Sequence, residues 1–155
     1  MDVSESLSFF SALLTYEIDL WNRLDEAVLA EHGIALGRLR ALEVVQRHGG
    51  SARVNEVSNE LRMTVGAASK MVDRLESDGL VRRSPNPDDR RSSLIGLTPT
   101  GAGLVQSGMA TFEHELVSCL PAHSHDEVAR LTDSLSALHA YLQERDRGSV
   151  AAARS

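Results

Sequence analysis

The chain has very little cysteine: Cys119 is the only one among its 155 residues. One cysteine cannot form an internal disulfide, and sparse cysteine is typical of proteins of the reducing cytoplasm. No apolar run approaches the roughly 20 residues that a membrane-spanning helix needs. The first ten residues lack the basic start and the cleavage site of a secretory signal. We therefore expect a cytoplasmic protein with no membrane partner.

Motifs that carry catalysis are missing as well. The sequence has no glycine-rich phosphate loop, no strained turn that presents a serine nucleophile, and no carboxylate pair in a recognisable setting. We therefore expect neither an enzyme nor a bound cofactor.

Positive charge is scarce overall but unevenly distributed. The formal net charge is −6, which argues against a nucleic-acid partner, because attraction to phosphate dominates such binding. Residues 62–91, however, hold seven basic and five acidic side chains, so this segment carries +2 and the remainder −8. Acid placed outside one basic segment confines contact with DNA to a single face. An ordinary acidic protein with one less acidic stretch would show the same distribution.

Apolar residues recur at three- and four-residue spacing through most of the chain, which indicates amphipathic helices. Thr64 is a predicted N-cap, Thr98-Pro99 is a strong helix start, and residues 124–127 form a capping box. The predicted helices span residues 4–31, 36–48, 54–61, 64–78, 99–120 and 125 onward. The predicted fold class is mainly α with one small β-ribbon.

Residues 81–98, VRRSPNPDDRRSSLIGLT, predict that ribbon. Leu94, Ile95 and Leu97 alternate with small residues in its second strand, and the turn holds four consecutive charges at residues 88–91. Four consecutive charged side chains are unlike a buried core, so we expect this tip to be a rigid element that projects from the domain. Because the ribbon directly follows a helix-turn-helix pattern, the two together predict a winged helix, a fold that mostly binds DNA.

The second helix of a helix-turn-helix enters the major groove with its exposed face. Val65, Ala68, Val72 and Leu75 are the predicted inner stripe of the helix at 64–78. The opposite face carries residues that allow close approach or can bond phosphates and base edges. These candidate DNA-contacting residues are Thr64, Gly66, Ala67, Ser69, Lys70 and Arg74. Taken alone, this helix also fits an ordinary solvated face.

The ribbon tip offers a second set of candidates. A wing beside the major groove can place its tip in the flanking minor groove, whose narrow A·T-rich segments attract arginine. Arg90 and Arg91 are therefore candidate contacts, and Asp89 can pair with Arg91 and fix its direction. The alternative is a solvated hairpin whose charges only satisfy one another.

The long terminal helices carry more apolar surface than a winged body of residues 36–100 can cover. Exposed apolar stripes of that length usually mark an interface. We therefore predict a homodimer formed through the first and last helices, against the alternative of a monomer whose helices fold back. The predicted regions are 1–34 and 100–147 for dimerisation, 35–99 for the winged helix-turn-helix, and a flexible tail at 148–155.

Residues 61–101 resemble the winged helix of MarR-type (multiple-antibiotic-resistance) regulators. The resemblance rests on MVDRLESDGLVRR and on NPDDRRSSLIGLTPTG, in which Asp89 and Arg91 match the family's wing-tip Asp-x-Arg. It implies a homodimer that binds palindromic operators in double-stranded DNA, mostly as a repressor and often of a neighbouring gene. It also implies that Ser69, Lys70 and Arg74 lie on the recognition helix and Arg91 in the minor groove.

The resemblance further implies several kinds of signal. Many members release DNA on binding small phenolic or other aromatic acids, and others respond to thiol oxidation or metal. The family's ligand site lies between the first two helices and the winged body, where Tyr16, Trp21, Arg23, His32 and Arg40 fall. An aromatic group plus a cation suits an aromatic carboxylate, although Trp21 fits core packing equally well. The function expected is thus a repressor released by a small aromatic ligand.

Redox and metal sensing remain alternatives. Cys119 lies on an apolar stripe, where a thiol is usually inert packing. His123-x-His125 with Asp126 and Glu127 nearby could hold zinc, but this spacing is common around polar turns. We expect no metal site. A winged helix used only for protein contact is a further alternative.

Overall fold

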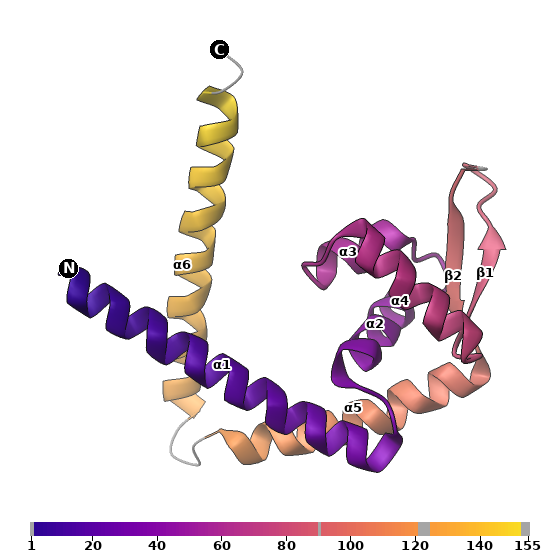
Figure 1. Ribbon diagram of the computed structural model, residues 1–155, viewed down its shortest axis with the longest axis horizontal. Helices are drawn as coiled ribbons and strands as arrows, with labels where there is room; N and C mark the ends of the chain where they lie inside the picture. Colours follow the sequence, from indigo (N-terminus) through magenta and orange to yellow (C-terminus); the bar gives the residue numbers. More distant parts are fainter. Residues whose placement is uncertain (1, 90, 121–124, 153–155) are drawn as a thin grey trace. The chain divides into compact units, whose positions relative to one another are not determined.

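The computed structural model describes residues 2–89, 91–120 and 125–152, without the side chains of residues 146–152. It divides into two compact units, Met1–Val117 and Ser118–Ser155, which are described separately. The elements, labelled in Figure 1, are α1 Val3–His32, α2 Leu36–Arg47, α3 Val54–Glu60, α4 Val65–Ser77, β1 Val81–Pro85, β2 Ser93–Leu97, α5 Pro99–Cys119 and α6 His125–Ala152. The predicted fold class, mainly α with one small ribbon, is confirmed.

The last helix differs from its prediction at its end. The sequence predicts a flexible tail from residue 148, whereas α6 continues to Ala152. No proline interrupts this stretch, and alanine is the best helix former, so the helix has no local reason to stop at Gly148. Residues 153–155 and the predicted cap Ser124 lie outside the described residues. None of the helices in the described ranges is both long and apolar enough to cross a membrane.

The core of the first unit forms around α2. Six residues of this helix are buried: Leu36, Leu39, Ala41, Leu42, Val44 and Val45. Ala68, Val72 and Leu75 of α4 are fully buried against the same core, as predicted. Leu24 from the end of α1 and Val105 from α5 join them. The flanking helices therefore share the core of the predicted 35–99 region.

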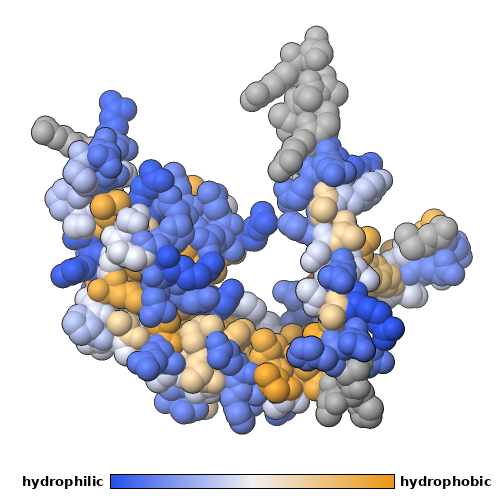
Figure 2. Space-filling view, turned by 180° about the vertical axis from the view of Figure 1, so that it is seen from behind, coloured by the Kyte–Doolittle hydropathy of each residue, from blue (hydrophilic) through white to orange (hydrophobic). Residues whose placement is uncertain are grey.

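Only the C-terminal part of α1 belongs to this core. In Figure 1, the N-terminal half of α1 extends away from α2, α3 and α4. The large apolar side chains of that half are exposed: Val3, Leu7, Phe9, Phe10, Leu13, Leu14, Tyr16, Ile18 and Trp21. Figure 2 shows hydrophobic patches along the lower edge of the view, where Figure 1 places α1 and α5. The apolar excess expected on the first helix is therefore present.

The second unit, taken by itself, also exposes large apolar side chains. Its helix α6 also carries exposed large apolar residues at helical spacing: Leu131, Leu135, Leu138, Tyr141 and Leu142. An isolated amphipathic helix gains little stability from propensity alone and needs a partner for its apolar face.

The hairpin is short and firmly attached at its base. β1 and β2 pair antiparallel from Val81↔Leu97 to Pro85↔Ser93. A third short pairing joins Ala52 to Ile95, whose N–H donates to the Ala52 carbonyl over 2.7 Å. Val81 and Ile95 turn inward and are buried. Because these inward residues belong to the core, the base of the hairpin is fixed to the body while its tip projects (Figure 1).

Thr98 connects three elements where the hairpin ends. Its hydroxyl donates to the carbonyl of Gly79, just after α4, over 2.7 Å. The same oxygen accepts from the N–H of Gly101 over 3.1 Å and so caps α5, as the Thr98-Pro99 signal predicts. Gly101 is required here, because an added Cβ would lie 2.0 Å from the carbonyl oxygen of Leu80.

Candidate nucleic-acid interface

Helix α4 presents one face to solvent along its whole length. Thr64 is its N-cap, and the Thr64 hydroxyl accepts a 3.2 Å hydrogen bond from the Ala67 N–H. The predicted contact residues Thr64, Gly66, Ala67, Lys70 and Arg74 are all exposed, and Ser69 is half-buried at the edge. The structure therefore brings the predicted recognition residues together on one surface.

The prediction for Val65 is wrong. The sequence places it on the inner stripe, but its side chain is 53% exposed. The buried stripe begins only at Ala68, one turn later, because the first turn of α4 extends beyond the core. An exposed valine beside Gly66 and Ala67 adds an apolar group to the face, of the kind that can contact a thymine methyl group.

Gly66 is not explained by the fold. A Cβ at this position would meet no atom within 4 Å, and its φ is not in the left-handed region. Glycine in a helix interior costs about 0.5–1 kcal/mol relative to alanine. A glycine that the packing does not need, on an exposed face, is what close approach of another molecule's backbone or base edge requires.

The cations of this face make no ion pair among the residues that the structure describes. From α2 to β2, Arg38, Arg47, Arg53 and Arg83 each pair with a carboxylate of the protein. Among the described residues, Lys70, Arg74, Arg82 and Arg91 make no such pair, and all but Arg82 lie on α4 or the wing tip. Unpaired cations gathered on one side of a helix and on the adjacent wing are the electrostatic signature of a phosphate-binding surface.

The wing tip is organised by its own side chains. Asn86, buried although polar, donates to the Ser92 hydroxyl over 2.8 Å and accepts from the Asp88 N–H over 3.0 Å. Asn86 is not among the residues predicted from the sequence; its place before Pro87, in a turn, was the available signal. Arg90 lies outside the described residues.

The predicted partnership of Asp89 needs correction. Its carboxylate accepts from the backbone N–H of Arg91 over 2.9 Å and not from the guanidinium group. This is the local bond that aspartate commonly makes to the backbone two residues ahead. Asp89 therefore shapes the turn from which Arg91 projects, and the exposed Arg91 side chain keeps its donors for another molecule.

The wing is braced against α4 by Arg83. Its guanidinium Nη2 lies 2.6 Å from Asp73 of α4, and its backbone N–H donates to Glu76 over 3.0 Å. These bonds fix the hairpin relative to the recognition helix. The two surfaces that carry Lys70 and Arg91 are therefore held at one separation.

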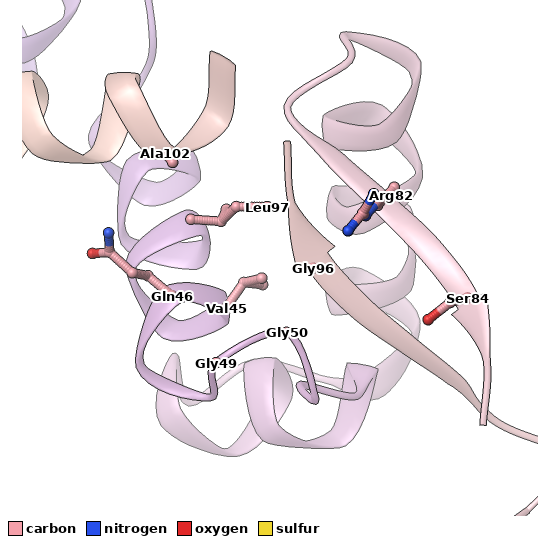
Figure 3. A pocket seen from close by; sticks show the side chains of 9 residues that line it. All are labelled: Val45, Gln46, Gly49, Gly50, Arg82, Ser84, Gly96, Leu97 and Ala102. Carbon is pink, nitrogen blue, oxygen red and sulfur yellow. The ribbon is translucent and has the colours of Figure 1, made fainter. Parts of the chain in front are cut away.

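The opposite side of the hairpin borders a different cleft, of about 530 Å³. Figure 3 shows Arg82 and Ser84 on β1 facing this space, with Val45 and Gln46 of α2 across from them. The turn at Gly49 and Gly50 closes one end, and a Cβ on Gly96 would lie 3.6 Å from the Cα of Gly50. No candidate residue from the sequence lines this cleft.

Three of the five predicted ligand-binding residues already have partners within the first unit. Arg23 pairs with Glu115 over 2.6 Å, and His32 hydrogen-bonds Thr111 over 2.8 Å, so both connect α1 to α5. Arg40 pairs with Glu43 and lies 5.8 Å from the centre of the Phe112 ring. Tyr16 and Trp21 are exposed. The three clefts described for this chain include none of the five.

The sensor alternatives gain no geometric support from the described residues. Within those ranges, no group of three or more His, Cys, Asp or Glu side chains is placed to hold a metal ion. His123 lies outside them. Cys119 is partly buried at the end of α5.

These features define a winged helix-turn-helix domain whose second helix presents Lys70 and Arg74 on its exposed face. The MarR family model matches residues 32–92. The multiple antibiotic resistance protein MarR of Salmonella typhimurium is 39% identical over 80 residues, which are 49% of this chain and 54% of that protein. The uncharacterized HTH-type transcriptional regulator YwhA of Bacillus subtilis is 30% identical over 95 residues, 60% of this chain and 66% of that protein.

A crystal structure of a mutant MarR from E. coli, complexed with operator DNA, has a TM-score of 0.73 and 27% identity. That match covers 89% of this chain and 99% of the E. coli chain. The sequence matches to the first relatives span about half of their length. The chain belongs to the MarR family, a family of transcriptional regulators and not of enzymes.

Proposed function

We propose that the protein is a homodimeric, sequence-specific DNA-binding regulator that represses a neighbouring gene from a palindromic operator. The observation that carries the proposal is a group of exposed cations, Lys70 and Arg74 on α4 and Arg91 on the wing, that make no ion pair with any residue the structure describes. The similar E. coli MarR was crystallised with operator DNA, which supports the same use of this surface.

A dimer fits the exposed apolar residues of α1 and of α6. A twofold dimer presents two recognition helices, which must match half-sites about one helical turn apart. Palindromic DNA has the same symmetry. A change in the separation of the two helices therefore changes the affinity for DNA. An effector causes such a change if it binds the protein more tightly at one separation than at another.

The effector in this proposal is a small aromatic acid bound near α1 and α2. Arg23 and Arg40 supply positive groups, His32 supplies a hydrogen-bonding ring, and Tyr16 and Trp21 supply aromatic surface. Such a ligand would compete with the existing contacts of Arg23 and His32 to α5. Hydroxybenzoates serve as probes: they should raise the melting temperature of the protein and lower its affinity for DNA. Unchanged melting and binding across the series would remove this part of the proposal.

Electrophoretic mobility shift on DNA from upstream of the protein's own gene tests DNA binding directly. Specific binding that weakens steeply as salt rises is expected, because phosphate contacts release counterions. A protein that shifts no genomic fragment at low salt would refute the regulator.

The dimer is tested by replacing Leu135 and Leu138 with glutamate. Both are exposed on α6, so the variant should fold with little local strain but lose an apolar interface. Sedimentation velocity should show a monomer where the parent protein is a dimer. A variant that stays dimeric would place the interface elsewhere.

A further inference from the structure

A cleft of about 440 Å³ lies between the recognition helix and the wing. Three guanidinium groups line it, from Arg53, Arg83 and Arg91, together with the hydroxyl groups of Ser69, Ser92 and Ser93. Asp89 is the one carboxylate among the lining residues, and the Arg91 N–H already binds it. The lining residues therefore include more positive than negative side chains and many hydrogen-bond donors.

The geometry of a DNA duplex indicates which part of the DNA would lie in this cleft. The major and minor grooves are separated by one sugar–phosphate strand. If α4 lies in the major groove and the wing in the adjacent minor groove, that strand must cross between them. The cleft occupies this position.

Arg53 is the cleft residue that the sequence analysis did not single out. It lies directly before α3, where Glu56 holds it in two ways. The Arg53 backbone N–H donates to Glu56 over 2.7 Å, and its guanidinium donates through Nε over 3.0 Å and through Nη2 over 2.6 Å. A carboxylate that grips both the backbone and the side chain leaves the guanidinium little freedom to turn.

Glu56 occupies only one edge of that guanidinium. Arginine has five N–H donors, and those on the Nη1 side remain when a carboxylate binds the Nε side. The remaining edge can donate two parallel hydrogen bonds to phosphate oxygens. Arg83 is already paired with Asp73 and forms the wall of the cleft. Arg91 has no ion pair among the described residues and faces the same space.

We propose that Arg53 and Arg91 together hold a backbone phosphate of the DNA strand that passes between α4 and the wing. The proposal rests on the DNA-binding function proposed above and adds Arg53, a residue outside the recognition helix and the wing tip, to the DNA-contacting surface. A contact to phosphate carries no base information, so it strengthens binding to every duplex equally.

Arg53→Gln is the direct test, with Arg47→Gln as its matched control. Both side chains are half exposed, at 51% and 52%, and each pairs with a glutamate, but Arg47 lies on α2 outside the cleft. Fluorescence anisotropy is measured over a salt series with two labelled duplexes, one from upstream of the gene and one of shuffled sequence. Arg53→Gln should bind both about tenfold more weakly, and the slope of log Kd against log salt should fall by about 0.9, the value for one lost phosphate contact.

A second variant, Arg53→Lys, keeps the charge but not the planar fork. It should retain the salt slope of the parent protein while binding both duplexes more weakly. Unchanged affinity and slope in Arg53→Gln would overturn the proposal, as would an equal loss in Arg47→Gln, which would show a general charge effect. If the parent protein itself binds neither duplex, the proposed function fails instead.

Discussion

Glycine has different surroundings in two regions, the junction between the hairpin and α5 and the exposed face of α4. At Gly101, a single added carbon would meet the Leu80 carbonyl oxygen at 2.0 Å, whereas at Gly66 it would meet nothing within 4 Å. The charges of the exposed face agree with this difference, since Lys70 and Arg91 make no ion pair among the described residues. The junction is closely packed within the chain, whereas the exposed face of α4 has space and charged groups available to another molecule.

The largest effect is expected at the junction. Gly101→Ala should destabilise the protein by about 3 kcal/mol, because overpacking against backbone leaves nothing that can move aside. Gly103, two residues further along α5, has open space around its Cβ position, so Gly103→Ala is the control and should stabilise the helix by about 1 kcal/mol. Urea unfolding followed by circular dichroism measures both. Equal stability of the two variants would show that the junction tolerates more than its packing indicates.

At the exposed face, loss of function without loss of stability is expected. Arg91→Ala should weaken binding to the upstream and the shuffled duplex alike, by about 1–3 kcal/mol, and should lower the salt slope by about 1, because a charge-assisted phosphate contact is lost. Its melting temperature should stay close to that of the parent, because the side chain has no ion pair among the described residues. An unchanged Kd in the anisotropy titration would refute the role of the wing.

Gly66→Ala separates the two regions most clearly. It should raise the free energy of unfolding by about 0.5–1 kcal/mol, since alanine favours the helix and meets no atom there. The same methyl group should weaken DNA binding if the duplex approaches this backbone closely. A more stable protein with undiminished affinity would show that Gly66 does not face the DNA.

The smallest effect concerns Glu60, which binds His48 over 2.7 Å and Arg47 over 2.6 Å. The hydrogen bond from His48, then the charge of Arg47, lowers the pKa of Glu60 below its usual value of 4.5. Its stabilising contribution is therefore complete above about pH 4.5 and is lost as the pH falls through the lowered pKa. Glu60→Gln should cost less than about 1 kcal/mol near pH 7, because the pair is partly exposed. Urea titrations should show this difference shrinking below pH 4.5, and a difference that grew on acidification would contradict the assignment.

The sequence predicts the order of elements and most of their ends because helix signals are local. Thr64 and Thr98 cap the helices that they were expected to cap, and Ala68, Val72 and Leu75 are buried as their spacing requires. Val65 fails because periodicity tells which side a residue faces but not how far the core extends. The prediction that the last helix ends before residue 148 is wrong because glycine and serine weaken a helix without having to end it.

Side-chain partners are harder to predict than elements. Asp89 was expected to bind the Arg91 guanidinium and binds its backbone N–H, because a short carboxylate reaches a nearby amide more readily than the end of a long side chain. Arg53 drew no attention in the sequence, since only the folded chain brings it beside residues of the wing. The unpaired state of Lys70 and Arg91 likewise depends on which carboxylates the fold uses elsewhere.

Thr98 has a consequence for how a signal would travel. Its single hydroxyl is bonded to the end of α4 and to the start of α5, and it closes the hairpin. The end of α4, the hairpin and the start of α5 are thus joined at one residue. Because the Thr98 hydroxyl bonds to both sides of the hairpin, we expect a displacement of α5 to move α4 and the hairpin together as one body. A signal that reached α5 would then change the orientation of both candidate DNA-contacting elements at once.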